Sequence, residues 1–374
     1  MDTLISHTSA LWALRRTRDG ALGSSLRYSA QPVPANAPRA GDLSHVLLHL
    51  PGIYTMEGEP EFITKDPCGS RHGNGFVSHV FRTEVPQGST IDFGGGVRCA
   101  SPALLALLMA PDLSRLELTV LLSELMGLYS IVPEADGGMI QRTVPLAVPE
   151  DFERLLAYIG SVNGAPLLRE ALGDACVRSG SPRETKLSLR LGLSCSKKGY
   201  GLPVLSMHDP LEVERIGSHF DERGIRRPDI LIKAPDGRGR PGEFRGVAFE
   251  YNGSIHNAQR GLARDIRRSN ELRAIGLKEY EIDAELYRDH GYMEDIAERA
   301  RRDAGYPRRH ISAESAYRRR TRHEDLYWEL ERIDGIHWGD KRRKYDLAYV
   351  VPQHSVSGLE RAQLFPCRSA CARP

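Results

Sequence analysis

Two apolar segments, each carrying one carboxylate, decide the fold of this chain: Arg227-Pro228-Asp229-Ile230-Leu231-Ile232 and Val247-Ala248-Phe249-Glu250-Tyr251-Asn252-Gly253. Both are rich in the branched and aromatic residues that favour β-strands. The glycine- and arginine-rich residues 237–242 between them predict a turn, so we expect the two strands to pair antiparallel. Lys278 to Ile282 predicts a third strand, preceded by a polar helix over residues 257–275. The stretch therefore predicts a sheet with carboxylates on it.

Strand alternation places both carboxylates on one face of the predicted pair. Ala248, Glu250 and Asn252 share a face of the second strand, and Asp229 shares a face with Leu231 on the first. Two neighbouring carboxylates in apolar strands are costly to bury unless a cation lies between them. Oxygen ligands suit Mg²⁺ or Mn²⁺, either of which activates water and stabilises charge on a phosphodiester. The pattern predicts a metal site near the strand ends.

Four further residues are candidates for this site, and each has a structural alternative. His256, at the start of the predicted helix, can act as general base or can be a surface or capping histidine. Asp265 and Arg268 form an i,i+3 pair, which is either a surface ion pair or a support for His256 and a phosphate contact. Glu184 fits a capping box with Ser181, and it can also be a third carboxylate at the edge of the site.

Length and composition are those of a globular protein of two or three domains. The chain has 374 residues, of which 40% are hydrophobic and 27% charged. The net charge of +2 excludes a global basic field, so nucleic-acid binding depends on local clusters, of which Arg318–Arg320 and Lys341–Lys344 are the densest. Acidic residues among these clusters favour a solvated helix face. The cysteine spacing indicates free thiols, and with no signal peptide or membrane span we expect a cytoplasmic protein.

The segments on either side of the central stretch have distinct patterns. Up to residue 178 the chain predicts a mixed, largely helical domain, with strands at residues 45–50 and 76–85 and helices beginning near Ser6, Ser101, Asp112, Glu150 and Pro166. Beyond residue 290, two helices and a basic, cysteine-containing tail predict a helical extension over 291–374. The domain boundaries expected are therefore 1–178, 179–290 and 291–374.

The order of the motifs carries a resemblance to a known superfamily. Pro228-Asp229, Glu250-Tyr251-Asn252-Gly253, His256, Asp265, Arg268 and Gly276 resemble the PD-(D/E)XK nucleases, in particular the very-short-patch-repair-endonuclease-like domains. The helix start at Ser181 to Thr185 fits the opening helix of that family. Ser6-His7-Thr8-Ser9-Ala10 is similar to a segment of bacterial proteins like AbiEi, an abortive-infection antitoxin and transcriptional regulator. The resemblance implies an α/β (α+β) fold with a central mixed sheet flanked by helices, restriction-endonuclease-like, after an AbiEi-like N-terminal domain.

The same resemblance implies roles for individual residues. Asp229, Glu250 and the carbonyl of Tyr251 would hold Mg²⁺ or Mn²⁺, and Glu184 would lie in the outer shell. His256 would transfer the proton, with Asp265 and Arg268 in support. Asn252 departs from the family, which has Lys or Asp there, so proton transfer rests on His256. The function implied is a metal-dependent DNA endonuclease in phage defence or DNA repair; the alternative is a catalytically inactive nuclease-fold regulator or antitoxin that binds DNA or a partner protein.

Overall fold

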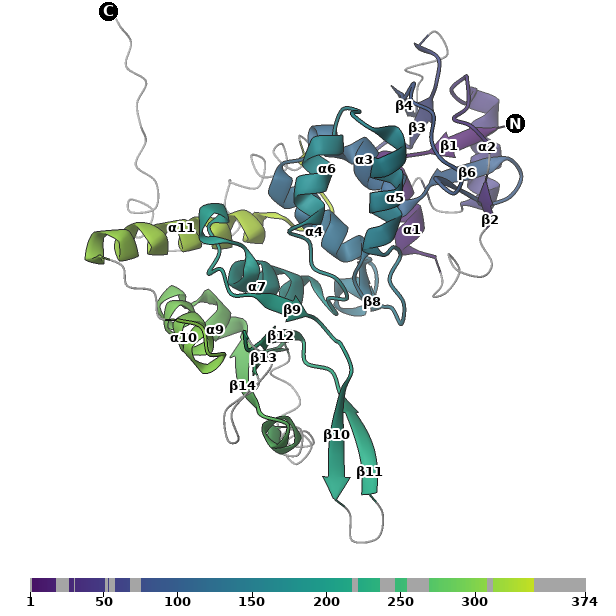
Figure 1. The fold of residues 1–374 in the computed structure, drawn as a ribbon. Coiled ribbons are helices and arrows are strands. Elements are labelled where there is room, and N and C mark those ends of the chain that lie inside the picture. Colours follow the sequence, from purple (N-terminus) through teal and green to yellow (C-terminus); the bar gives the residue numbers. More distant parts are fainter. Residues whose placement is uncertain are drawn as a thin grey trace, which may run out of the picture.

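The computed structural model describes residues 2–339 except 18–26, 30, 51–52, 54–57, 68–74, 217–220, 236–245, 254–268 and 308–311. Its architecture is mixed α/β, with several sheets and helices packed against them (Figure 1). The sheet that concerns function has the order β14-β13-β12-β9. These strands are β9 (Val204–Ser206), β12 (Ile230–Lys233), β13 (Gly246–Asn252) and β14 (Leu277–Asp283).

The two central strands pair as the sequence predicted. β12 and β13 are antiparallel, with Ile230 opposite Phe249 and Lys233 opposite Gly246. The pairing ends at Ile230 and Phe249, and Asp229 directly precedes it in the chain. β14 runs parallel to β13, and β9 runs antiparallel to β12, so the sheet is mixed. The predicted turn at 237–242 lies outside the described residues.

Both faces of this sheet are covered by apolar side chains, as the strand alternation requires. Ile230, Ile232, Val247 and Phe249 belong to the main hydrophobic core. Leu231, on the other face, packs with Leu272 and Leu277 in a second, smaller cluster. Asp229 directly precedes the first residue of β12. Gly276 has a φ of +83°, as expected of the glycine that ends a helix.

Four helices of the C-terminal half surround the main-core face of the sheet. They are α7 (Pro182–Gly192), α9 (Ala284–Arg288), α10 (His290–Asp303) and α11 (Ala313–Arg332). Between β9 and β12 the chain forms a hairpin of β10 (Leu211–Ile216) and β11 (Asp221–Arg226), which projects from the body (Figure 1). This hairpin was not predicted from the sequence.

The N-terminal part combines a sheet with a group of helices, in agreement with a mixed domain whose second half is helical. Its six strands have the order β2-β5-β6-β1-β3-β4. They are β1 (Thr3–Ile5), β2 (Arg27–Ser29), β3 (Glu61–Thr64), β4 (Val77–Val80), β5 (Thr90–Asp92) and β6 (Val97–Ala100). The helices are α1 (His7–Arg15), α2 (Ala40–His49), α3 (Pro102–Met109), α4 (Arg115–Leu125), α5 (Pro149–Ile159) and α6 (Ala165–Leu172), with a hairpin of β7 (Tyr129–Ile131) and β8 (Met139–Gln141) between α4 and α5.

The strand predicted over residues 45–50 is wrong, because these residues end helix α2. The cause lies upstream: the Asp42 carboxylate accepts the Arg39 backbone N–H at 2.8 Å and caps the helix before the apolar run begins. The apolar run alone did not separate a helix from a strand.

One connected hydrophobic core extends from Leu4 to Trp338 and crosses residue 178, so the division there stays a prediction. Among the described residues, no helix is both long and apolar enough to span a membrane.

Candidate metal centre

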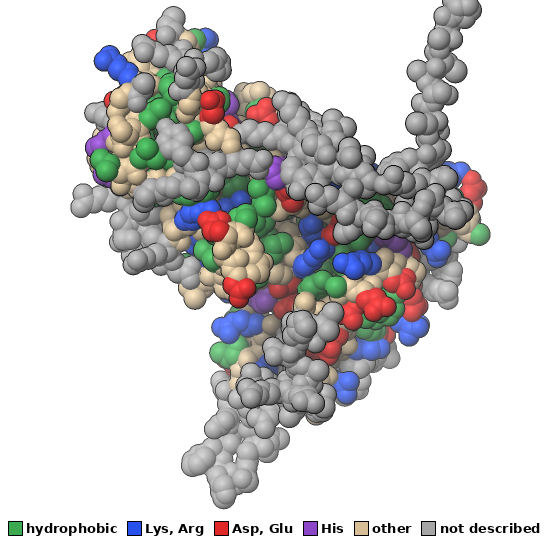
Figure 2. Space-filling view, turned by 180° about the vertical axis from the view of Figure 1, so that it is seen from behind, with side chains coloured by type: hydrophobic (Ala, Val, Ile, Leu, Met, Phe, Trp, Pro, Cys, Tyr) green, Lys and Arg blue, Asp and Glu red, His purple; other side chains and the backbone are tan. Residues whose placement is uncertain are grey.

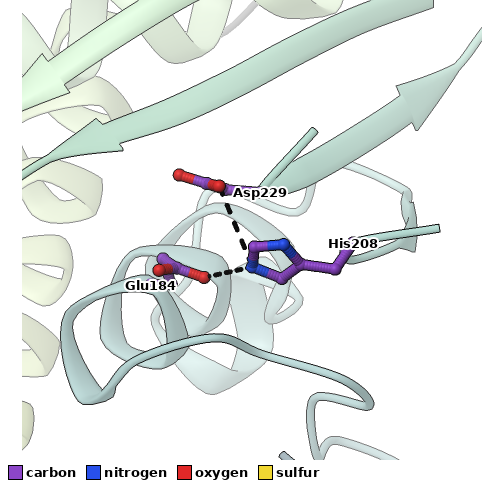
Figure 3. Close-up of side chains that lie close together, drawn as sticks. All are labelled: Glu184, His208 and Asp229. Atoms are coloured by element: carbon purple, nitrogen blue, oxygen red, sulfur yellow. Dashed lines mark hydrogen bonds and ion pairs between the residues drawn. The ribbon is translucent and has the colours of Figure 1, made fainter. Parts of the chain in front are cut away.

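Three side chains from three separate segments meet beside the first residue of β12. They are Glu184 on α7, His208 in the loop after β9, and Asp229, and their ligand atoms lie within 4.8 Å of one another. The Nε2 atom of His208 is 2.6 Å from Glu184 Oε2 and 3.8 Å from Asp229 Oδ1, so both contacts meet at one ring nitrogen (Figure 3). The three side chains are between 12% and 19% exposed, so solvent reaches them.

The start of α7 positions Glu184. Ser181 is the N-cap: its Oγ accepts the Glu184 backbone N–H at 3.2 Å and donates to Glu184 Oε1 at 2.9 Å. The second carboxylate oxygen, Oε2, accepts the backbone N–H of Gly180 at 2.9 Å, one residue before the N-cap. The predicted capping arrangement is therefore present in altered form. It fixes the position of the carboxylate while Oε2 also contacts His208, so one side chain belongs both to the helix start and to the cluster.

Asp229 is held by the neighbouring strand. Its Oδ2 accepts the backbone N–H of Tyr251 at 2.8 Å, which leaves Oδ1 directed to His208. This contact extends the β12–β13 pairing through a side chain in place of a backbone carbonyl. The carboxylate therefore lies at the point where the strand pair ends.

His208 is held in an uncommon backbone conformation. Its φ is +52°, and its backbone N–H donates to Pro228 O at 2.9 Å, which ties this loop to the residue before Asp229. Burial by itself lowers the pKa of the imidazole, but the hydrogen bond and charge of Glu184 and the charge of Asp229 outweigh it. The pKa of His208 is therefore raised, and the ring carries its positive charge more readily than an ordinary histidine.

The residues present fit a divalent cation. A Cβ atom added to Gly180 would lie 2.7 Å from His208 Nε2 and 2.9 Å from Glu184 Oε2, so the space beside these two atoms depends on the glycine. Two carboxylates and one imidazole form a mixed oxygen and nitrogen donor set. Because imidazole is a poor partner for Mg²⁺, this set suits Mn²⁺ better. Coordination through Nε2 requires the neutral ring.

The other residues predicted for the site have different positions. Glu250 is buried on β13 and is not among the described residues whose ligand atoms converge with Glu184 and Asp229. Tyr251 contributes its backbone N–H to Asp229, and Asn252 is exposed at the end of the strand. His256, Asp265 and Arg268 lie outside the described residues, so their predicted roles stay predictions.

Sequence reasoning missed His208 and Gly180. His208 precedes Asp209-Pro210 in a short loop, with no regular spacing from Asp229 or Glu184 that would single it out. Gly180 stands in Ser179-Gly180-Ser181-Pro182, which the sequence presented only as a helix start. The one local signal was that His208, a residue type that binds metals, lies in the segment before Asp229.

The surroundings of the centre mix both charge signs. Arg178 Nε lies 3.9 Å from Asp209 Oδ1, next to His208 in the chain. A cavity of about 430 Å³ adjoins this region, because Val177 and Met207, which directly precede Arg178 and His208, line it. On the face shown in Figure 2, the Lys and Arg side chains of described residues are interspersed with Asp and Glu. No large single-sign patch appears there.

Comparisons with known proteins assign no family. No family model matches the chain, and no curated protein or solved structure matches it.

Proposed function

We propose that this protein is a divalent-metal-dependent phosphodiesterase that cleaves DNA, with Mn²⁺ or Mg²⁺ as its cofactor. The observation that carries the proposal is the convergence of Glu184, His208 and Asp229 at the end of two paired strands. The mixed sheet with α7 beside it supports a restriction-endonuclease-like core, which the resemblance of the sequence implies. DNA as substrate rests on that same resemblance.

In this proposal Glu184, His208 and Asp229 hold the cation, which when bound lowers the pKa of water and neutralises charge on the phosphate. Glu184 and Asp229 are fixed in advance by backbone N–H groups of Gly180 and Tyr251, so little ordering is needed when the ligand arrives. His256 is proposed as general base, with Asp265 and Arg268 in support, and Glu250 as a further carboxylate behind Asp229.

A plasmid-nicking assay tests this function. The wild type should convert supercoiled plasmid to nicked circles with Mn²⁺ or Mg²⁺, and EDTA should stop it. Asp229→Asn, Glu184→Gln, His208→Ala and His256→Ala should each lose most of the activity. Asp295→Asn is the matched control, because Asp295 is 57% exposed on α10 and pairs only with Arg299 among the described residues. Equal activity in all variants would mean contamination and would end the proposal.

The alternative function is that of a nuclease-fold regulator or antitoxin without catalysis, which binds DNA or a partner protein. One observation favours it: Glu184 and Asp229 both contact His208 Nε2 and raise the pKa of its imidazole, so the protein itself supplies a group that can offset part of their negative charge. Mn²⁺ binding separates the two functions. A chain that binds no Mn²⁺ near neutral pH, as measured by electron paramagnetic resonance, fits the regulator.

A further inference from the structure

We propose that Arg178 binds the phosphate group of the ligand at this centre; the inference rests on the proposed function and assigns a phosphate-binding residue to it. Arg178 lies two residues before Gly180 and next to the loop of His208. It was not among the residues that the sequence suggested.

The backbone of Arg178 is held in a conformation that arginine rarely adopts. Its φ is +64°, in the left-handed region. Two backbone hydrogen bonds keep it there: Arg178 N–H to Met126 O at 2.9 Å, and Leu128 N–H to Ser179 O at 2.7 Å. His208, with φ of +52°, is in the same region, so two left-handed residues flank one cluster. Such strain is concentrated at functional sites, because the surrounding structure must enforce it.

The guanidinium of Arg178 keeps its hydrogen-bond donors available. Its contact to Asp209 is 3.9 Å long, well beyond a charge-assisted hydrogen bond, and no hydrogen bond to the guanidinium occurs within the described part of the chain. The Nε atom is buried without an acceptor, while the side chain as a whole is 37% exposed. An arginine fork that is partly desolvated and open on one side matches the oxygens of a phosphate.

The guanidinium of Arg178 lies close to the loop that carries His208, because its Nε is 3.9 Å from Oδ1 of Asp209, the residue after His208. It lowers the pKa of His208, against the effect of the two carboxylates. Arg183, on α7 next to Glu184, is committed elsewhere, because its Nη1 donates to both oxygens of Glu331 at 2.8 Å. Arg227 is close to Asp229 in the chain but is exposed, whereas the Nε atom of Arg178 is buried. Of these three described arginines, Arg178 therefore combines an uncommitted guanidinium with a position beside the His208 loop.

The chemistry needs such a group. During hydrolysis water forms the new P–O bond, the leaving oxygen departs with the electron pair of the old bond and takes up a proton, and negative charge gathers on the other phosphate oxygens. Arg178 exchanges no proton in this process. Its guanidinium donates hydrogen bonds to those oxygens, and donors already in position contribute most when the charge develops.

The test uses the full chain, Mn²⁺ and bis(p-nitrophenyl) phosphate, a phosphodiester that needs no target sequence. Arg178→Gly suits the left-handed backbone and should lower turnover by roughly 100-fold, the usual effect of losing one such donor. Added methylguanidine should restore part of the turnover in Arg178→Gly, but not in Arg178→Lys. The Mn²⁺ affinity should stay as in the wild type. Arg227→Gln is the matched control and should retain wild-type turnover.

Two results would overturn the inference: wild-type turnover in Arg178→Gly, or loss of Mn²⁺ binding in parallel with turnover, which indicates a structural role. If the wild type itself shows no Mn²⁺-dependent turnover, the proposed phosphodiesterase activity is refuted. Phosphate binding then tests the role of Arg178 separately. Titration of the Mn²⁺-loaded protein with inorganic phosphate should show roughly tenfold to hundredfold weaker binding in Arg178→Gly. Equal phosphate affinity would refute the role of Arg178 by itself.

Discussion

Gly180 shows at the scale of one residue how closely the metal centre is packed. Its φ is outside the left-handed region, so alanine meets no backbone strain there, only the contacts at 2.7 Å and 2.9 Å to His208 Nε2 and Glu184 Oε2. Gly180→Ala should push these two atoms apart, lower the unfolding free energy by about 1–2 kcal/mol and weaken Mn²⁺ binding. Urea unfolding and Mn²⁺ titration measure the two effects.

Gly41→Ala is the control for this change. Gly41 is exposed in the first turn of α2, and an added Cβ would meet nothing within 4 Å. Alanine should stabilise the helix slightly, by less than about 1 kcal/mol, and should leave Mn²⁺ binding unchanged. A similar loss in both glycine variants would mean that the contacts at Gly180 have no special effect.

His208 gives the cluster a pH dependence in the metal-free protein. Because its pKa is raised in the folded state, the stabilisation is fully present below the unfolded value near 6.5 and is lost as the pH rises through the folded pKa. The difference in unfolding free energy between wild type and His208→Gln should therefore be larger at about pH 5.5 than at about pH 8.5. Urea unfolding in EDTA at both values measures it.

Mn²⁺ should reverse this dependence, because the cation competes with the proton at Nε2. Its stabilising effect should grow from about pH 5.5 to about pH 8.5 in the wild type and should be much smaller in His208→Gln. The wild type and His208→Gln could instead differ in unfolding free energy by the same amount at both pH values, with and without Mn²⁺. That result would exclude His208 as the titrating group.

At the scale of elements, Glu331 connects α11 to α7. Its carboxylate accepts two hydrogen bonds from Arg183 and lies 3.5 Å from the buried Lys186. Burial lowers the pKa of Lys186, and the charge of Glu331 opposes this. Glu331→Gln leaves two cations without their carboxylate and should lower the unfolding free energy by about 2 kcal/mol. Urea unfolding near neutral pH measures the loss.

The same helix provides the comparison. Glu314 and its partner Arg318 near the start of α11 are both 73% exposed. Glu314→Gln should change the unfolding free energy by less than about 0.5 kcal/mol, because solvent screens such pairs. If Glu331→Gln and Glu314→Gln lost the same unfolding free energy, burial would not be the reason that the α7–α11 contact stabilises the protein.

At the scale of the whole molecule, Arg15 joins segments far apart in the chain. Its Nε and Nη2 donate to Glu124 at 2.7 Å and 2.6 Å, and Nη2 also donates to Gly335 O at 2.6 Å. Arg15→Met leaves the Glu124 carboxylate, only 1% exposed, without its cation and should cost about 3–5 kcal/mol. Arg16→Met, which removes a pair whose carboxylate is 61% exposed, should cost under about 1 kcal/mol.

Because one connected core includes both halves, the loss of unfolding free energy in Arg15→Met should destabilise both halves. With Trp12 and Trp338 replaced by Phe, the fluorescence of Trp328 on α11 reports on the C-terminal part. In Arg15→Met, the unfolding transition followed by fluorescence should coincide with the transition followed by circular dichroism. Both should occur at a lower urea concentration than in the same protein with Arg15 intact. Separate transitions, with only the circular dichroism shifted, would show that the halves unfold independently.

The strands and caps could be predicted because their causes are local. Alternation within residues 247–252 determines which side chains share a face, and Ser181 and Pro182 determine where α7 begins. The sequence paired Asp229 with Glu250 and offered Glu184 as a third carboxylate at the edge of the site, whereas the described residues bring Asp229 to Glu184 and His208. The strand predicted at 45–50 failed because the same apolar run fits a buried helix, and the Asp42 cap decided between them.

By itself, the sequence determined the antiparallel pairing of residues 230–233 with residues 246–249 and the helix start that holds Glu184, since each depends on neighbours in the chain. Only the tertiary structure decided that His208 and Gly180 complete the cluster and that Arg178 lies beside the loop of His208. These residues come from loops whose paths depend on long-range hydrogen bonds, such as His208 N–H to Pro228 O and Arg178 N–H to Met126 O. Local propensity does not encode such contacts, because their partners are distant in sequence and are brought near only when the core packs.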